Sequence, residues 1–222
     1  MKIKLLFTAM LTAVSVSLFA QEDDQVRTIF SKGSAKWGGE FSFFGTGAGF
    51  DERFFGGGGF ECGAIRNQSL EFGIFLEGFA SESHTDYKIT NDDKFFYGGG
   101  FGGALIKPII MSNSPVHFAI PIRVGGGAVG YYSSENFWDD DHHYYSHYDR
   151  RNDYEDECAV FVFEPGVNIE FNMLRHFRMW VGASYRMFGS LNLDYRNAGG
   201  EIIGSQDLNG MIYSVGFSFG IY

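Results

Sequence analysis

The residues of this chain best suited to chemistry lie in one acidic stretch, Ser133–Glu157, which contains nine carboxylates and three histidines. Carboxylate oxygens suit hard ions such as Ca²⁺, and imidazole nitrogens suit Zn²⁺ or Cu²⁺. The candidate metal ligands are Asp139, Asp140, Asp141, His142, His143 and His147. Their spacing matches neither a helix–loop–helix calcium loop nor a zinc site built on Cys or His-Glu-x-x-His. We therefore expect a solvated acidic loop, with adventitious binding of metal or of a partner as the alternative.

A glycine-rich run, Gly98–Gly103, has the spacing of a dinucleotide-binding fingerprint. That motif works only when a helix follows, because the helix N-terminus meets the phosphates. The next residues, Ala104–Pro108, do not read as a helix, so we expect these glycines to make room for bulky neighbours.

No histidine has an evident nucleophile and orienting acid beside it, which favours a chain without catalytic residues or a cofactor.

A second set of charged residues alternates with apolar ones inside strand-like segments. In Leu70–Ser81, for example, Leu70, Phe72, Ile74 and Leu76 oppose Glu71 and Glu77. A period of two indicates a strand, because successive side chains point to opposite faces. The charged residues expected on one common face are Glu40, Glu61, Glu71, Glu77, Arg123, Glu164, Glu170, Arg178 and Arg186. Their opposite signs predict cross-strand pairing in a small interior, with a proton or ion path as the less favoured interpretation.

Eight segments have the character of strands, and most run to between nine and seventeen residues. They are Trp37–Gly45, Phe54–Ile65, Leu70–Ser81, Phe95–Lys107, Val116–Tyr132, Ala159–Phe171, Phe177–Phe188 and Met211–Tyr222. Strands in soluble sheets average about five or six residues, whereas a tilted membrane-spanning strand needs about nine to eleven. Short connections (66–69, 108–115 and 172–176) alternate with longer ones (46–53, 82–94, 133–158 and 189–210), which is the asymmetry of outer-membrane barrels.

The pattern of side chains predicts which face meets lipid. In Met211–Tyr222, large apolar residues from Met211 to Ile221 alternate with Ser214, Gly216, Ser218 and Gly220. The small, lysine-poor face suits a narrow lumen better than a solvated surface, although a half-buried soluble sheet has the same periodicity. Because strand edges cannot survive in hydrocarbon, we predict a closed eight-stranded antiparallel up-and-down transmembrane β-barrel, all-β in class. Pro121 and Pro165 each remove a ladder donor, so we expect a bulge, or a donor turned into the lumen, at each.

The N-terminus reads as an export signal. Lys2 and Lys4 precede an apolar run and the small residue Ala20, after which a polar stretch begins. Residues 1–20 are therefore expected to be a cleaved signal peptide and residues 21–36 a periplasmic segment.

The remaining chain has 15 basic and 27 acidic residues, a net charge near −12. That balance argues against nucleic-acid binding, and Cys62 and Cys158 are expected near opposite ends of the barrel, too far apart to bond.

From residue 37 to 222 the chain resembles the small outer-membrane β-barrel proteins of Gram-negative bacteria, the OmpA/OmpX-like class. The resemblance rests on the export signal, the strand lengths, the loop asymmetry and the closing Phe217–Tyr222 segment. It implies an outer-membrane location, contact with lipid, and recognition of the final strand by the barrel assembly machinery. Tyr222 departs from the usual pattern, because it shares a face with Ser218 and Gly220.

The expected function is non-enzymatic: a monomeric barrel with a structural or surface-interaction role, whose outer loops meet an unidentified extracellular ligand. One alternative is a lipid-modifying enzyme on the same barrel. Another is a soluble lipocalin-like carrier of an apolar ligand, although Ser34–Trp37 lacks that family's Gly-x-Trp.

Overall fold

The computed structural model describes residues 36–221, except 51–52, 88–93, 135–153, 190, 196–199 and 205–207. The expected signal peptide, most of the expected periplasmic segment and all six candidate metal ligands lie outside the described residues. Within the described part of the chain, no helix is both long enough and apolar enough to cross a membrane.

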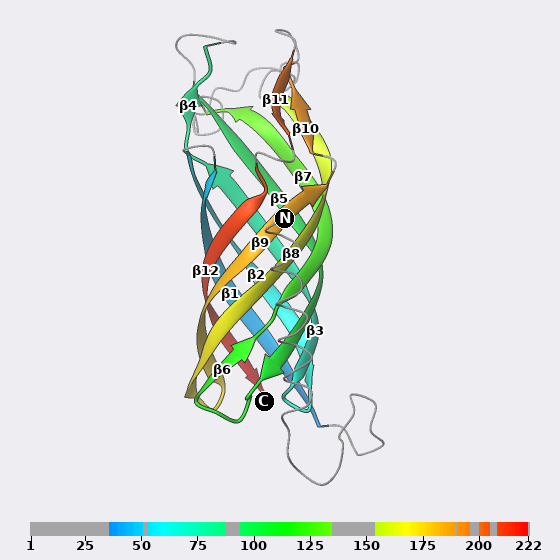
Figure 1. The fold of residues 1–222 in the computed structure, drawn as a ribbon, viewed down its shortest axis with the longest axis vertical. Coiled ribbons are helices and arrows are strands. Elements are labelled where there is room, and N and C mark those ends of the chain that lie inside the picture. The colour runs from blue at the N-terminus through cyan, green and yellow to red at the C-terminus, as the bar shows by residue number, and fades with distance from the viewer. Residues whose placement is uncertain are drawn as a thin grey trace, which may run out of the picture. The chain divides into compact units, whose positions relative to one another are not determined.

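The described chain forms a closed antiparallel ring of long strands (Figure 1). The elements are β1 (Trp37–Phe50), β2 (Arg53–Arg66), β3 (Leu70–Ser81), β4 (His84–Thr85), β5 (Lys94–Ile110), β6 (Val116–Ala119), β7 (Ile122–Ser133), β8 (Tyr154–Leu174), β9 (Phe177–Gly189), β10 (Asn192–Asp194), β11 (Glu201–Gly204) and β12 (Gly210–Ile221). The ring closes where β1 pairs with β12, in a register that runs from Gly39 opposite Ile221 to Gly47 opposite Tyr213. With β6 and β7 taken as one broken strand, eight strands surround the interior, which confirms the predicted fold class.

The two ends of the barrel differ. The turn end carries the short connections after β2, β5 and β8, whereas the loop end carries β4, β10, β11 and the long connections (Figure 1). The strands reach further toward the loop end than predicted. Residues 46–53, expected as a long loop, belong mostly to β1 and β2, and the segment 189–210 contains the β10–β11 hairpin. Glycine-rich sequence around residues 45–49 and 56–59 hides the alternation that marks a strand.

Both prolines interrupt a ladder without shifting its register. Ile120 and Pro121 separate β6 from β7, yet both strands keep one register against β8. At Pro165 the pairing of β8 with β9 lapses between Phe163 and Gly166 and then resumes in register. The sequence predicted a bulge, or a donor turned into the lumen, at each proline. No register shift lies at these two positions, so the bulge is absent there, and the turned donor stays a prediction. In the described ladders the register shifts lie elsewhere, next to Tyr132, Leu174 and Asp194.

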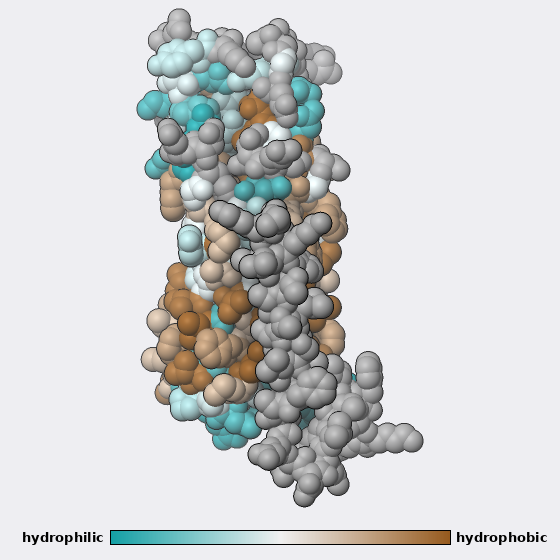
Figure 2. Space-filling view, in the orientation of Figure 1, coloured by the Kyte–Doolittle hydropathy of each residue, from teal (hydrophilic) through white to brown (hydrophobic). Residues whose placement is uncertain are grey.

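The apolar faces of the strands point outward. Leu76 is 50% exposed, Phe161 53%, Val167 44% and Phe217 44%, so none of them packs in a central core. Figure 2 shows hydrophobic side chains over the part of the barrel nearer the turn end and hydrophilic ones at the loop end. This arrangement reverses that of a soluble protein. It contradicts the lipocalin-like alternative, in which the outer wall of the barrel is polar and faces water.

The interior has two contrasting halves. Ion-paired side chains fill the half toward the turn end, whereas aromatic and aliphatic residues from β2, β5, β7 and β9 fill the half toward the loop end. Leu193 on β10, Ile203 on β11 and Leu208 continue this apolar cluster into the connection between β9 and β12. The sequence pattern predicted the polar half but not the apolar one.

A narrow ring forces some strands to approach very closely. Gly103 on β5 pairs with Gly125 on β7. A Cβ atom on Gly103 would lie 2.1 Å from the carbonyl oxygen of Val124 and 2.5 Å from the Cα atom of Gly125. Neither contact is sterically acceptable, and both involve backbone that cannot move aside. Glycine at this position therefore permits close approach of two backbones, whereas the sequence predicted that it makes room for bulky side chains.

We predict that Gly103→Ala destabilises the folded barrel by about 1–3 kcal/mol, because the added methyl group pushes β5 away from β7. Gly100→Ala on the same strand is the matched control: its Cβ atom would point outward and lie 3.5 Å from the nearest atom, the carbonyl oxygen of Glu77. The measurement is the free energy of unfolding in urea of barrels refolded into lipid vesicles. Equal stabilities for the two variants would contradict the close-approach argument.

Candidate functional site

The charged residues of the interior come from strands all around the ring. The nine side chains predicted to share one face are all buried: Glu40 on β1, Glu61 on β2, Glu71 and Glu77 on β3, Arg123 on β7, Glu164 and Glu170 on β8, and Arg178 and Arg186 on β9. Alternation along each strand turns them inward, and the curvature of the ring then brings them together.

Toward the turn end, the charges gather around a lysine. The Nζ atom of Lys107 on β5 lies 2.7 Å from Glu40 Oε1, 2.6 Å from Glu71 Oε2 and 3.8 Å from Glu170 Oε1. The Nη1 atom of Arg178 lies 3.4 Å from Glu40 Oε2 and 3.7 Å from Glu170 Oε2. Two cations thus share three carboxylates in a site from which water is excluded.

His117 on β6 belongs to the same group. Its Nε2 atom lies 2.9 Å from Glu170 Oε2, and the side chain is fully buried. Its partner is a carboxylate, and no serine or cysteine in the described structure makes a hydrogen bond with it. The geometry therefore fits an ion pair or hydrogen bond that ties β6 to β8.

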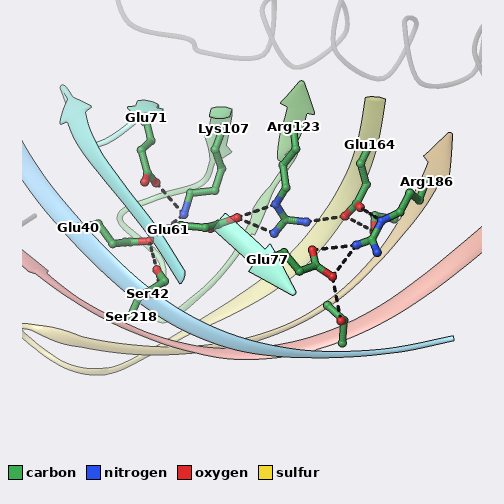
Figure 3. Close-up of polar contacts among 12 residues, drawn as sticks. Glu40, Ser42, Glu61, Glu71, Glu77, Lys107, Arg123, Glu164, Arg186 and Ser218 are labelled. Carbon is green, nitrogen blue, oxygen red and sulfur yellow. Dashed lines mark hydrogen bonds and ion pairs between the residues drawn. The ribbon is translucent and has the colours of Figure 1, made fainter. Parts of the chain in front are cut away.

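Nearer the middle of the barrel, two arginines clamp three carboxylates (Figure 3). Arg123 contacts Glu61 Oε1 at 2.6 Å through Nη2 and Glu164 Oε1 at 2.6 Å through Nη1. Arg186 donates to both oxygens of Glu77, at 2.7 and 2.8 Å, and its Nε donates to Glu164 Oε2 at 2.5 Å. Hydrogen bonds between two charged groups are roughly twice as strong as those between neutral groups, and here they link β2, β3, β7, β8 and β9.

Lys107 was not identified from the sequence. It stands at the end of the predicted strand Phe95–Lys107, next to Pro108, where a lysine reads as a surface residue. Its spacing could have identified it. Lys107 lies an even number of residues from Phe101 and Leu105, so all three face the same side of the strand, and the structure buries the other two. Its inward position supplies a fourth cation alongside the three predicted arginines.

The interior still contains more acid than base. Six buried glutamates, in the described residues, meet the four cations Lys107, Arg123, Arg178 and Arg186. The excess is visible in the bonding, because Glu71 Oε1 and Glu61 Oε2 have no hydrogen-bond partner among the described residues. Glu170 Oε1 likewise has none. Buried carboxylate oxygens without a partner are costly, so these atoms are weak points of the network.

A smaller polar cluster lies at the loop end. Asp86, in the connection from β3 to β5, accepts hydrogen bonds from Tyr131 on β7 at 3.0 Å and from Tyr195 after β10 at 2.7 Å. The Tyr131 hydroxyl also lies 3.0 Å from Nε2 of His84, whose ring stacks on Tyr97. One carboxylate therefore ties two outer connections to a strand of the ring.

The electrostatics of this cluster favour neutral side chains. Burial, followed by the Arg53 guanidinium, lowers the pKa of the His84 imidazole below its usual value, although the Asp86 carboxylate opposes this. Burial and the hydrogen bond to Asp86 raise the pKa of the Tyr195 hydroxyl. Both groups are consequently uncharged near neutral pH.

The remaining chemistry-bearing residues are dispersed. In the part of the chain that is described, no group of three or more His, Cys, Asp or Glu side chains is arranged to hold a metal ion. Cys62 faces outward on β2 and Cys158 lies near the loop end of β8; both are free. His176 binds the backbone carbonyl of Gly220.

Comparison with known proteins adds information about the fold. No protein-family model matches the chain, and no curated protein matches it in sequence. A major outer membrane protein from Thermus thermophilus superposes with a TM-score of 0.51 and 9% identity, over 82% of this chain and 99% of that one.

Two further solved barrels are more distant in shape. Neisserial surface protein A has a TM-score of 0.44 and 10% identity, over 85% of this chain and 97% of that one. Ail of Yersinia pestis, solved with the heparin analogue sucrose octasulfate, has a TM-score of 0.44 and 10% identity, over 83% and 97%. The chain has the fold of the small outer-membrane β-barrel proteins.

We predict that Glu77→Gln destabilises the barrel by about 3 kcal/mol or more, because it removes the carboxylate that binds Arg186 through both oxygens. The buried Arg186 would then keep only Glu164, which it shares with Arg123. Glu71→Gln is the matched substitution on the same strand and should cost no more than about 1 kcal/mol, since Lys107 keeps Glu40 and Glu170. Unfolding in urea, followed by the loss of heat-modifiable gel mobility, measures both. The reverse order of stabilities would show that the network is not organised as described.

The low pKa of His84 predicts a stability that depends on pH. A histidine whose folded-state pKa lies below its unfolded value stabilises the native state at a pH above the unfolded value, about 6.5, and this contribution is lost as the pH falls. The unfolding free energy of the native protein should thus decrease more on acidification than that of His84→Gln. Measuring both proteins above and below pH ~6.5 tests this, and parallel curves would contradict it.

Proposed function

We propose that this chain is an outer-membrane barrel of Gram-negative type that acts without catalysis, as a rigid support for an extracellular interaction surface. The observation that carries the proposal is the apolar outer wall, since residues such as Ile74, Val181 and Phe219 leave 41–61% of their surface exposed. Such a wall is stable in hydrocarbon and unfavourable in water. In this orientation the turn end faces the periplasm and the loop end faces outward.

The filled interior supports a role at the surface and not in transport. Ion pairs fill the turn-end half, and the apolar cluster fills the rest. A cavity of about 20 Å³ lies between Arg186 and the rings of Phe55, Phe79 and Phe188. That volume holds about one water molecule, so this cavity is too small for a ligand.

The contacts of the described histidines support the proposal that the protein acts without catalysis. His84 contacts a tyrosine, His117 a glutamate and His176 a backbone carbonyl, and none of these three described histidines makes a hydrogen bond with a serine, threonine or cysteine. A hydrolase of the Ser–His or Cys–His kind would need such a pair, because an unactivated hydroxyl or thiol is a weak nucleophile.

The distribution of charge supports the outer loops as the working surface. The four predicted outer connections contain 18 of the 27 acidic residues but only 6 of the 17 basic ones. An extracellular ligand with positive charge, or one that binds through a divalent cation, suits this surface. The candidate metal ligands Asp139–Asp141, His142, His143 and His147 belong to this proposal, as does recognition of β12 by the barrel assembly machinery and a monomeric state.

We predict that Leu76→Arg destabilises the vesicle-inserted barrel by about 2–4 kcal/mol, because it places a charge in hydrocarbon near the middle of β3. Tyr87→Arg is the control: this side chain is 79% exposed and lies beyond the strand, in the outer connection after β4. Unfolding free energies in vesicles, together with the amount of each variant in the outer-membrane fraction, provide the measurement. If Leu76→Arg were as stable as the native protein, the outer wall would not face lipid and the proposal would fail.

A further inference from the structure

The positive side chains of the turn end lie on one side of the ring. We call Lys36, Arg66 and Arg175 the basic arc: Lys36 precedes β1, Arg66 ends β2, and Arg175 stands in the turn between β8 and β9. Because β9, β12, β1 and β2 are consecutive neighbours in the ring, the arc spans four adjacent strands. Lys36 and Arg175 are exposed and Arg66 is half-buried.

Backbone contacts hold the two ends of the arc in place. The Lys36 amide donates to Asn67 Oδ1 at 3.0 Å, and the Asn67 amide donates to the Lys36 carbonyl at 2.8 Å. At the other end, the Gly220 amide donates to the carbonyl of His176, at 3.1 Å. The backbone at Lys36 and at the turn that carries Arg175 is therefore held against neighbouring strands, and Arg66 belongs to β2 itself.

No acidic side chain among the described residues offsets the arc. The described Asp and Glu residues lie either in the interior or toward the loop end. The remaining turn, residues 111–115, carries no charge and lies across the ring between β5 and β6. The turn end therefore has a positive side and a neutral side.

An aromatic belt lies on the lipid face of the same strands. Trp37, 61% exposed, pairs with Arg66 at the rim. The neighbouring outward rings are Phe41, Phe43, Phe60, Phe177, Phe217 and Phe219, several of which contact one another at centroid distances of 4.7–6.1 Å. On the neutral side the exposed residues are largely aliphatic, for example Ile106, Val124 and Ile169. Figure 2 shows the general order, with hydrophilic side chains below a hydrophobic band.

We propose that the basic arc binds the head groups of anionic phospholipids in the periplasmic leaflet, with their acyl chains against the aromatic belt. Trp37 lies beside Arg66 at the rim, and a Trp ring next to Lys and Arg marks the interface between hydrocarbon and head groups. The Phe rings continue from this depth into the hydrocarbon. Arginine forks match phosphate oxygens, and each basic residue near an anionic surface favours binding by about five-fold. Charge complementarity thus selects phosphatidylglycerol-like lipids over zwitterionic ones. This inference rests on the proposed membrane location.

The test uses the full barrel in phosphatidylcholine vesicles that contain phosphatidylglycerol as a minor lipid. Brominated chains are placed on one lipid or the other, and quenching of Trp37 fluorescence reports which lipid lies beside the arc; Trp37→Phe identifies the Trp37 signal. The native protein should favour phosphatidylglycerol by about five-fold or more, and less so in high salt. The triple variant Lys36→Gln/Arg66→Gln/Arg175→Gln should lose the preference.

Lys94→Gln is the control, because this exposed cation lies at the loop end and its loss should leave the preference unchanged. A native barrel that shows no preference, or a triple variant that keeps it, overturns the inference. Heat-modifiable gel mobility shows whether each sample has inserted as a folded barrel. It therefore separates the test of the lipid preference from the test of the membrane location. A protein that inserts without lipid preference refutes the basic arc alone, whereas one that inserts into neither kind of vesicle refutes the membrane location as well.

Discussion

Closure of the backbone hydrogen-bond ring is the constraint on which this structure depends. In hydrocarbon, an unpaired peptide group finds no water to bind, so every strand needs a neighbour on both sides. The pairing of β1 with β12 meets that requirement and limits the ring to a small circumference. A small ring has little room inside, and this explains both the inward small residues and the contact of Gly103 with Gly125. The outer wall is then free to be apolar.

The same narrowness determines how charges behave inside. Water cannot solvate them, so each glutamate must find a lysine, an arginine, a histidine or a hydroxyl within reach. The paired residues come from strands far apart in sequence, as with Arg186 and Glu77, and they therefore brace the wall across its diameter. The apolar cluster beyond them completes the filling. A filled interior results, which suits the proposed surface role of the loop end.

Much of this architecture was predictable from the sequence, because a strand with lipid on one face and a cramped polar lumen on the other has a clear period of two. β3, β8, β9 and β12 all show it, and nine interior charges were identified on that basis. Elsewhere the signal fails for physical reasons. Glycine on both faces removes the alternation of apolar and polar residues from the loop-end parts of β1 and β2. Lys107 stands beside a proline at the end of a strand, where the pattern no longer indicates a face. The inward aromatic cluster and the β10–β11 hairpin depend on contacts across the barrel, which no local pattern encodes.

The apolar cluster also separates the outer connections into two kinds. Leu191, Leu193, Ile203 and Leu208 belong to the connection between β9 and β12, yet they are buried with the interior. These side chains close the interior at the loop end, so a polar replacement at any of them would place an unpaired polar group in the apolar cluster. Exposed side chains of the outer connections, such as Tyr87, carry no such constraint.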